Sequence, residues 1–234
     1  MKIVAAAKIL KANDQLAAET RAKLDAAGVF GVNLVGSPGA GKTTLLEALL
    51  AHWKGGGCHA HACRGHATSM ARPRPAVIEG DIAGSIDAER IEKLGLPVVQ
   101  INTQGACHLD ASMVAAALAN LDLGAIDLLF IENVGNLVCT AGFDLGERLR
   151  ILVLSTSEGD DKAAKYPAIF QGSQALFITK TDLLPQTNFD LQRITADFRR
   201  LAPEGVVFQV AAIRGEGIPA AADWLLRKCR SVAR

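Results

Sequence analysis

The clearest chemical pattern in the sequence is a glycine-rich segment that ends in lysine and threonine. It matches the phosphate-binding pattern G-x-x-x-x-G-K-[ST] and reads Gly36-Ser37-Pro38-Gly39-Ala40-Gly41-Lys42-Thr43. Glycines let successive backbone N–H groups surround phosphate oxygens, and the N-terminus of the helix that follows adds positive potential. We expect Lys42 to neutralise the β- and γ-phosphates, the Thr43 hydroxyl to bind Mg²⁺, and Thr44 to contact the nucleotide as well. The segment therefore predicts a site for a nucleoside triphosphate.

Two acidic residues follow predicted strands and could complete the metal side of this site. Asp81 closes the sequence Glu-Gly-Asp after the apolar strand 76–79, and Glu132 follows the apolar strand 126–131. Hydrolysis at a P-loop requires a carboxylate near Mg²⁺ and a group that senses the γ-phosphate. We expect both acids to hold the hydrated metal and the Gly135 N–H to reach the γ-phosphate. The predicted catalytic residues are Lys42, Thr43, Asp81 and Glu132.

A third segment predicts which base is bound. Thr179-Lys180-Thr181-Asp182 resembles the [NT]KxD element of GTPases, in which the aspartate accepts hydrogen bonds from guanine N1–H and the exocyclic amine. Adenine lacks this pair of donors, so Asp182 would select GTP over ATP. The Lys180 stem would cover the base plane. The Ala212 N–H, after the last predicted strand, would meet guanine O6, and Thr179 would complete the base site.

Cysteine and histidine residues indicate a second kind of chemistry. Cys107 and His108 are adjacent at a predicted loop-to-helix junction, and Cys139 lies seven residues after Glu132. Two thiolates and an imidazole suit Zn²⁺ or Ni²⁺, because both ions accept soft sulfur and nitrogen ligands. Buried thiols are also common without a metal, so a structural role stays open on spacing alone. The short distance from Glu132 to Cys139 means that nucleotide state could move a ligand.

The elements that must position these residues alternate along the chain. Apolar runs predict strands at 29–35, 76–79, 97–101, 126–131, 149–155, 175–179 and 206–210, and helical periodicity predicts helices at 8–27, 43–53, 87–94, 110–121, 190–200 and 217–230. This alternation predicts a doubly wound α/β fold, with a mainly parallel sheet covered by helices on both faces and ligands at the carboxyl ends of the strands. The length of 234 residues fits one P-loop domain over residues 1–234.

Residues 55–75 interrupt the alternation. They read GGGCHAHACRGHATSMARPRP, in which glycines and prolines exclude regular periodicity, so we expect an irregular exposed loop. The loop contains further metal-type side chains, namely Cys58, His59, His61, Cys63 and His66. A metal-storage or scaffold protein built on this loop, with incidental nucleotide binding, is therefore one alternative. A kinase or ATPase on the same scaffold is another.

Composition narrows the possible partners. The 25 basic and 24 acidic residues give a formal net charge of +1, which argues against nucleic-acid binding and against a polybasic membrane protein. No apolar run approaches the roughly 20 residues that a membrane span requires. The N-terminus carries charged residues before any signal-type apolar core develops, and the five cysteines are odd in number. We therefore expect a reducing, cytoplasmic location.

Taken together, these segments resemble the HypB family of hydrogenase-maturation nickel-insertion GTPases. The resemblance rests on GSPGAGKTTLLEAL, EGD followed by DAERI, INTQGACHLDA, DLLFIENVGNLVC, SEGDDKAAKYP and ITKTDLL, and it covers residues 8–54 and 76–230. It implies Mg²⁺-dependent GTP hydrolysis, a GTP-dependent homodimer, and Ni²⁺ or Zn²⁺ held at the dimer interface by Cys107, His108 and Cys139. It also implies two partners, a small zinc-containing nickel metallochaperone and the large subunit of [NiFe]-hydrogenase. The related urease-type accessory GTPases carry a Cys-Pro-His tripeptide at their metal site and stay an alternative.

The sequence departs from the HypB pattern at several positions. The N-terminus lacks the Cys-x-x-Cys-Gly-Cys motif of many members. Gly84 stands where a switch threonine is common, with Ser85 one position later, while Thr179 and Ala211 replace the usual asparagine and serine. Each lost polar contact is worth about 0.5–1.5 kcal/mol when it is made. We therefore expect a modest affinity for guanine nucleotides.

Overall fold

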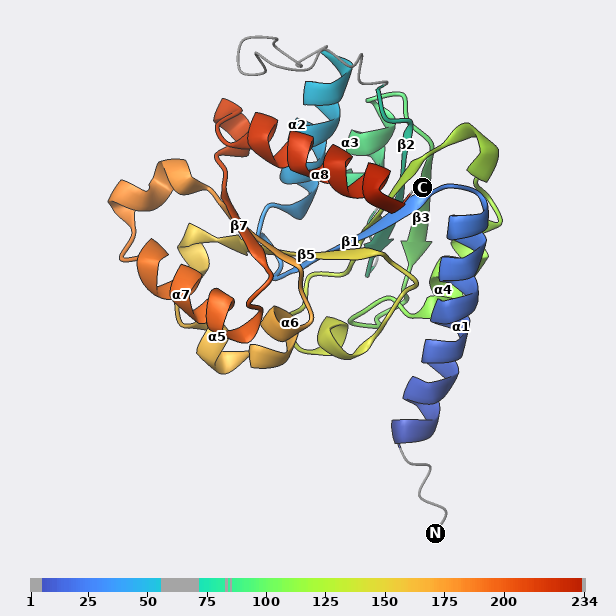
Figure 1. Ribbon diagram of the computed structural model, residues 1–234, viewed down its shortest axis with the longest axis horizontal. Helices are drawn as coiled ribbons and strands as arrows, with labels where there is room; N and C mark the ends of the chain where they lie inside the picture. Colours follow the sequence, from blue (N-terminus) through green and yellow to red (C-terminus); the bar gives the residue numbers. More distant parts are fainter. Residues whose placement is uncertain (1–5, 56–71, 83, 85, 233–234) are drawn as a thin grey trace.

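The computed structural model describes residues 6–55, 72–82, 84 and 86–232 (Figure 1). The strands of this part are β1 Phe30–Gly36, β2 Pro75–Asp81, β3 Val98–Asn102, β4 Leu128–Glu132, β5 Leu149–Ser155, β6 Ala175–Thr179 and β7 Val206–Gln209. The α-helices are α1 Ala6–Ala26, α2 Lys42–Lys54, α3 Ile86–Glu92, α4 Ala111–Leu118, α5 Lys162–Lys165, α6 Pro167–Gln171, α7 Leu191–Leu201 and α8 Ile218–Val232. Short 3₁₀ turns lie at η1 Leu123–Ala125, η2 Cys139–Gly142, η3 Thr156–Glu158, η4 Thr181–Gln186 and η5 Ala212–Arg214.

The strands form one parallel sheet in the order β3-β2-β4-β1-β5-β6-β7. Parallel neighbours must be joined by crossovers, and the helices between the strands provide them. The strand order reverses at β1, and ligands of such sheets bind beyond the carboxyl ends of the strands at this reversal. The glycine-rich segment 36–43 begins at that point.

Helices bury apolar side chains on both faces of the sheet. On one face, α2, α3 and α8 pack on β1, β4 and β5 through residues that include Leu46, Ile91 and Leu225. On the other face, α1 and α4 cover one half of the sheet and α5 to α7 cover the other half. Figure 1 shows α1 beside α4, in agreement with the packing of these two helices against each other. The predicted doubly wound α/β fold is therefore confirmed.

Most predicted elements are present with their ends shifted by one to three residues. The predicted loop 55–75 is wrong at its last residue, because β2 begins at Pro75. Proline is accepted at the first position of a strand, where no backbone N–H is required. Glu132 was predicted to follow a strand but is the last residue of β4. The short helices α5 and α6 were not predicted, since one or two turns carry too little periodicity to be recognised. Among the helices of the described residues, none is long and apolar enough to cross a membrane.

Candidate functional site

The glycine-rich segment connects β1 to α2 with the backbone that phosphate binding requires. Gly39 and Gly41 have φ angles of +72° and +89°, which side chains with a Cβ rarely adopt. A Cβ on Gly36 would lie 2.4 Å from the Val153 carbonyl oxygen, so the turn also needs glycine for close packing. Lys42 folds back over the turn, and its Nζ donates a hydrogen bond to the Ser37 carbonyl at 3.3 Å. The backbone of the loop is thus arranged around a central lysine.

A pocket with a volume of about 430 Å³ lies beside this loop at the carboxyl ends of the strands. The predicted site residues that line it are Pro38, Gly39, Gly41, Lys42, Thr43, Thr44, Asp81, Glu132, Gly135 and Lys180. Gly135 approaches the loop closely, because a Cβ there would lie 2.7 Å from the Pro38 nitrogen. The structure therefore brings the predicted phosphate and Mg²⁺ residues together in one cavity.

Acidic and hydroxyl oxygens gather on one side of the pocket. The Thr43 hydroxyl donates to Glu132 Oε1 at 2.7 Å, and Glu132 is 3% exposed. Glu79 is equally buried and lies at the same register as Glu132 on the neighbouring strand. Asp81 accepts hydrogen bonds from the backbone N–H groups of Ile82 and Gly84, at 2.7 and 2.9 Å. Hydroxyl and carboxylate oxygens are the donor set that Mg²⁺ prefers, so these residues fit that ion.

Of the predicted base-recognition residues, Lys180 lines this pocket, whereas Thr179, Asp182 and Ala212 are not among its lining residues. The Thr179 hydroxyl donates to the Ala40 carbonyl at 2.6 Å, so in this structure it supports the phosphate loop from the adjacent strand. Lys180 has a left-handed φ of +56°, and its Nζ donates to the Gly39 carbonyl at 2.8 Å. Asp182, in η4, lies 4.0 Å from the Arg214 guanidinium at the end of η5. Binding of guanine by Asp182 and Ala212 stays a prediction.

The three predicted soft-metal ligands form a cluster. One ligand atom from each of Cys107, His108 and Cys139 can be chosen so that all lie within 4.8 Å of one another. The Cys107 Sγ is 3.7 Å from His108 Nδ1, and the His108 ring packs on Phe143 with centroids 3.9 Å apart. All three ligand residues are half-buried. The loop before α4 and the turn η2 thus present two sulfurs and one nitrogen to a common point.

The electrostatic environment of the cluster changes the pKa of two of its three predicted ligands. The hydrogen bond with Cys139 raises the pKa of the Cys107 thiol, and burial and the charge of the second thiolate act in the same direction. Burial lowers the pKa of His108, although the nearby Asp110 carboxylate opposes the shift. The thiol of Cys107 is therefore protonated at neutral pH, while the imidazole is neutral and ready to bind a cation. A divalent metal would replace the thiol protons.

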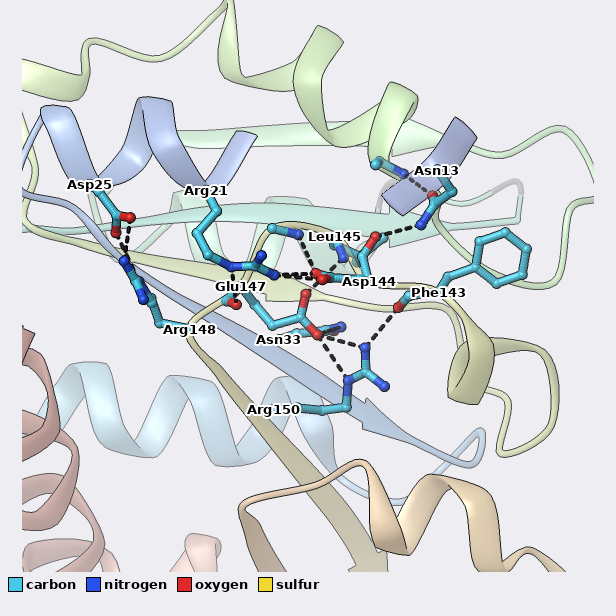
Figure 2. A network of polar contacts seen from close by, with 12 residues as sticks. Asn13, Arg21, Asp25, Asn33, Phe143, Asp144, Leu145, Glu147, Arg148 and Arg150 are labelled. Atoms are coloured by element: carbon cyan, nitrogen blue, oxygen red, sulfur yellow. Dashed lines mark hydrogen bonds and ion pairs between the residues drawn. The ribbon is translucent and has the colours of Figure 1, made fainter. Parts of the chain in front are cut away.

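A buried polar network supports the segment that carries Cys139 (Figure 2). Arg150, on β5, pairs with Glu147 at 2.7 Å, and both side chains are at most 10% exposed. The same guanidinium donates to the carbonyls of Ala141 and Phe143, at 3.2 and 2.8 Å. Arg150 therefore anchors both η2 and the ring that packs on the predicted histidine ligand.

Asn136 joins the phosphate loop to the cluster of predicted metal ligands. Its backbone N–H donates to the Gly36 carbonyl at 2.9 Å. Its side-chain Oδ1 accepts the N–H groups of Val138 and Cys139, at 2.7 and 3.0 Å. A single residue, Asn136, is therefore hydrogen-bonded to both the start of the phosphate loop and the turn that carries Cys139.

Several site residues escaped the sequence analysis or lie outside the described residues. Glu79, Arg90 and Asn133 also line the pocket but were not predicted. The available signal for Glu79 was an acidic residue within an otherwise apolar strand. The predicted metal-type side chains of the loop, Cys58, His59, His61, Cys63 and His66, lie outside the described residues, as does Ser85.

Comparisons with known proteins agree with the geometry. The family model described as CobW/HypB/UreG, nucleotide-binding domain, matches residues 31–209. The hydrogenase maturation factor HypB of Azotobacter vinelandii is 46% identical over 221 residues, covering 94% of this chain and 67% of that protein. The hydrogenase/urease maturation factor HypB of Helicobacter hepaticus is 40% identical over 225 residues, covering 94% of this chain and 86% of that protein. A crystal structure of HypB from Helicobacter pylori in complex with nickel has a TM-score of 0.83 and 35% identity, and the match covers 95% of this chain and 97% of that one.

Proposed function

This chain belongs to the HypB family of nucleotide-binding P-loop GTPases, and on that basis we propose that it is a GTP-hydrolysing metallochaperone for nickel. In this proposal it binds nickel, or zinc, through Cys107, His108 and Cys139 and assists nickel insertion into [NiFe]-hydrogenase. Binding of nickel is supported by the nickel complex of the Helicobacter pylori relative. The hydrogenase role is supported by the names of the Azotobacter and Helicobacter relatives.

The observation that carries the proposal is the shared segment between the two sites. Residues 132–139 begin with Glu132, which contacts Thr43 in the nucleotide pocket, and end with Cys139 in the thiol cluster. Asn136 lies between them and contacts both the phosphate loop and Cys139. A P-loop alone would support any nucleotide hydrolase, and a thiol cluster alone would support any metal protein. Their connection supports delivery of a metal under control of a nucleotide.

The residues of the pocket have separate roles in the proposed hydrolysis. Lys42 neutralises charge on the β- and γ-phosphates, while the backbone N–H groups of the loop fix the phosphate chain. Thr43, Asp81 and Glu132 would hold Mg²⁺, which supplies charge neutralisation at the phosphate oxygens. The Gly135 N–H contacts the γ-phosphate and so distinguishes GTP from GDP. Asp182 and Ala212 select guanine over adenine.

The proposed partners follow from the delivery role. A small zinc-containing metallochaperone would supply nickel, and the hydrogenase large subunit would receive it. GTP would promote a homodimer that brings two thiol clusters to one interface, and the protein would act in the cytoplasm. Nickel for urease is a second candidate destination, because the Helicobacter hepaticus relative carries both roles in its name.

Paired measurements of turnover and metal content test the proposal. GTP hydrolysis is measured with Mg²⁺, and nickel and zinc stoichiometry is measured by titration of the apo-protein. Lys42→Ala should abolish turnover and keep metal binding, because the ammonium acts on phosphate charge and not on the thiols. Cys107→Ala should lose the tight metal site and metal-promoted dimerisation but keep hydrolysis by the monomer.

Cys229→Ala provides a matched control for the loss of a thiol. Cys229 lies on α8 outside the cluster, and burial raises the pKa of its thiol to about 12. This variant should retain the metal stoichiometry of the unmodified protein. Tight metal binding that survives Cys107→Ala but disappears with Cys58→Ala and Cys63→Ala would favour a storage site in the loop. Turnover of ATP in preference to GTP would favour a kinase or ATPase.

A further inference from the structure

Asn133 has a side chain that reaches from the nucleotide pocket to the segment of the predicted metal ligands. It follows Glu132, is 1% exposed, and lines the pocket. Its backbone N–H donates to the Leu34 carbonyl at 3.0 Å, which fixes the residue to β1. Its side-chain Oδ1 accepts two backbone N–H groups, from Leu109 and from Val134, each at 3.0 Å. Leu109 is the residue directly after His108.

The orientation of the Asn133 amide is determined by these contacts. Both partners are N–H donors, so the atom that they contact must be the oxygen. The NH₂ group therefore points elsewhere, and in the described part of the structure it is buried with no hydrogen-bond acceptor. A buried amide donor without an acceptor reduces stability, and such a group in a pocket indicates an acceptor that arrives with a ligand.

Leu109 also packs on the strand that carries two acids of the pocket. Its side chain is fully buried and packs on Gly80, where a Cβ would lie 2.7 Å from Leu109 Cδ1. Gly80 separates the two acids Glu79 and Asp81 on β2, both of which line the pocket. The backbone next to His108 is thus held by a hydrogen bond from one acid-bearing segment and by close packing on another.

We propose that Asn133 is a positioning residue that couples the bound nucleotide to the metal ligand His108. Its Nδ2 donates to an oxygen that enters the pocket with the γ-phosphate of GTP, and its Oδ1 carries the resulting shift to Leu109 and the adjacent histidine. GDP brings no such oxygen. The inference rests on the proposed function, and it names the side chain through which GTP changes the affinity for metal.

Asn13 offers a matched control because it supports the metal segments without lining the nucleotide pocket. It is a buried asparagine of α1, shown in Figure 2. Its Nδ2 donates to the Asp144 carbonyl at 2.8 Å, and its Oδ1 accepts the Ala111 N–H at 2.9 Å. Asn13 thus joins the segment after Cys139 to the start of α4. Its loss should weaken metal binding equally in every nucleotide state.

The experiment titrates Ni²⁺ into the full chain with Mg²⁺ and either GDP or a non-hydrolysable GTP analogue. In the unmodified protein, the ratio of the two nickel affinities should fall in the range typical of allosteric coupling, about 5- to 150-fold. Asn133→Asp keeps an acceptor for the Leu109 N–H, removes the donor and adds a buried negative charge, so the ratio should fall to about 1. Asn133→Ala should also remove the difference in nickel affinity between the two nucleotide states, and it should weaken nickel binding in both. Asn13→Ala should weaken nickel binding in both states and preserve the ratio.

One result would overturn the inference and leave the proposed function intact, namely a ratio in Asn133→Asp equal to that of the unmodified protein. An unmodified protein that hydrolyses GTP and binds nickel with the same affinity in both nucleotide states would overturn the inference and also the nucleotide control of metal delivery. Failure of the unmodified protein to hydrolyse GTP or to bind nickel would instead contradict the proposed function. Thermal unfolding of Asn133→Asp and Asn13→Ala measures any general loss of stability. A variant that loses the ratio but keeps its Tm has lost the coupling and not the fold.

Discussion

Replacement of Arg150 by alanine tests whether the buried polar network supports the metal segment. The guanidinium is 10% exposed and makes an ion pair with Glu147, whose carboxylate is 6% exposed. It also satisfies the carbonyls of Ala141 and Phe143. Arg150→Ala leaves the Glu147 carboxylate buried, with the Asn33 amide and the Leu145 N–H still donating to it. Figure 2 shows these groups around one carboxylate.

The magnitude follows from the burial of the pair. Removal of one partner from a buried ion pair costs about 3–5 kcal/mol of folding free energy, which is a large part of a typical total of about 5–15 kcal/mol. In a chain of this size, about 1 kcal/mol shifts the Tm by about 2–4 °C, so we expect a decrease of about 6–20 °C. The nickel affinity should also fall, because η2 and the ring on His108 lose their anchor.

Differential scanning calorimetry and nickel titration measure the two effects. Arg200→Ala is the control, since Arg200 pairs with Asp197 while its side chain is 73% exposed, and such surface pairs contribute little. The double variant Glu147→Gln with Arg150→Met removes both charges and should recover part of the Tm. It should not recover nickel affinity, because methionine cannot donate to the two carbonyls. Equal Tm values for Arg150→Ala and Arg200→Ala would refute the reasoning.

Three further predictions concern the nucleotide, protons and packing. Asp182→Asn should weaken GTP binding by about 1.5–3 kcal/mol, because charged hydrogen bonds are lost, and should allow xanthine nucleotides to bind. Competition binding measures this change, and an unchanged preference for GTP would contradict the role of Asp182. Nickel affinity should rise about tenfold per pH unit from pH 6 to 8 through the Cys107 proton that nickel displaces, because the pKa of Cys107 is raised and its thiol is protonated throughout that window. The pKa of His108 is lowered, so His108 should release no proton when nickel binds at pH 8. Calorimetry in buffers of different ionisation enthalpy counts the protons released on binding, and a count of zero would contradict the assignment of Cys107 as a ligand. Gly80→Ala should displace Leu109 and weaken nickel binding, and an affinity equal to that of the unmodified protein would show that this packing does not position the ligands.

The sequence by itself determined the elements and the phosphate loop. The loop residues 36–43 are contiguous, so their glycines and lysine specify a local conformation that needs few distant contacts. Parallel strands buried on both faces read as apolar runs, which is why β5 and β6 were predicted with the bounds that the structure has. The cluster of Cys107, His108 and Cys139 was also predicted, from the types of its side chains and from the resemblance of both segments to the HypB family.

The tertiary structure alone decided which residues from different segments meet. Glu79 lies beside Glu132 because β2 and β4 are neighbours, although β3 and α4 separate them along the chain. The Thr179 hydroxyl contacts the phosphate loop, and the Asn133 amide contacts Leu109, through pairings that no local pattern encodes. The physical reason is that periodicity reports whether a side chain is buried, whereas its partner depends on strand order, register and crossover geometry. Those are set by the free energy of the whole fold, and they bring the predicted ligands into a pocket and a thiol cluster that Asn133 and Asn136 connect by hydrogen bonds.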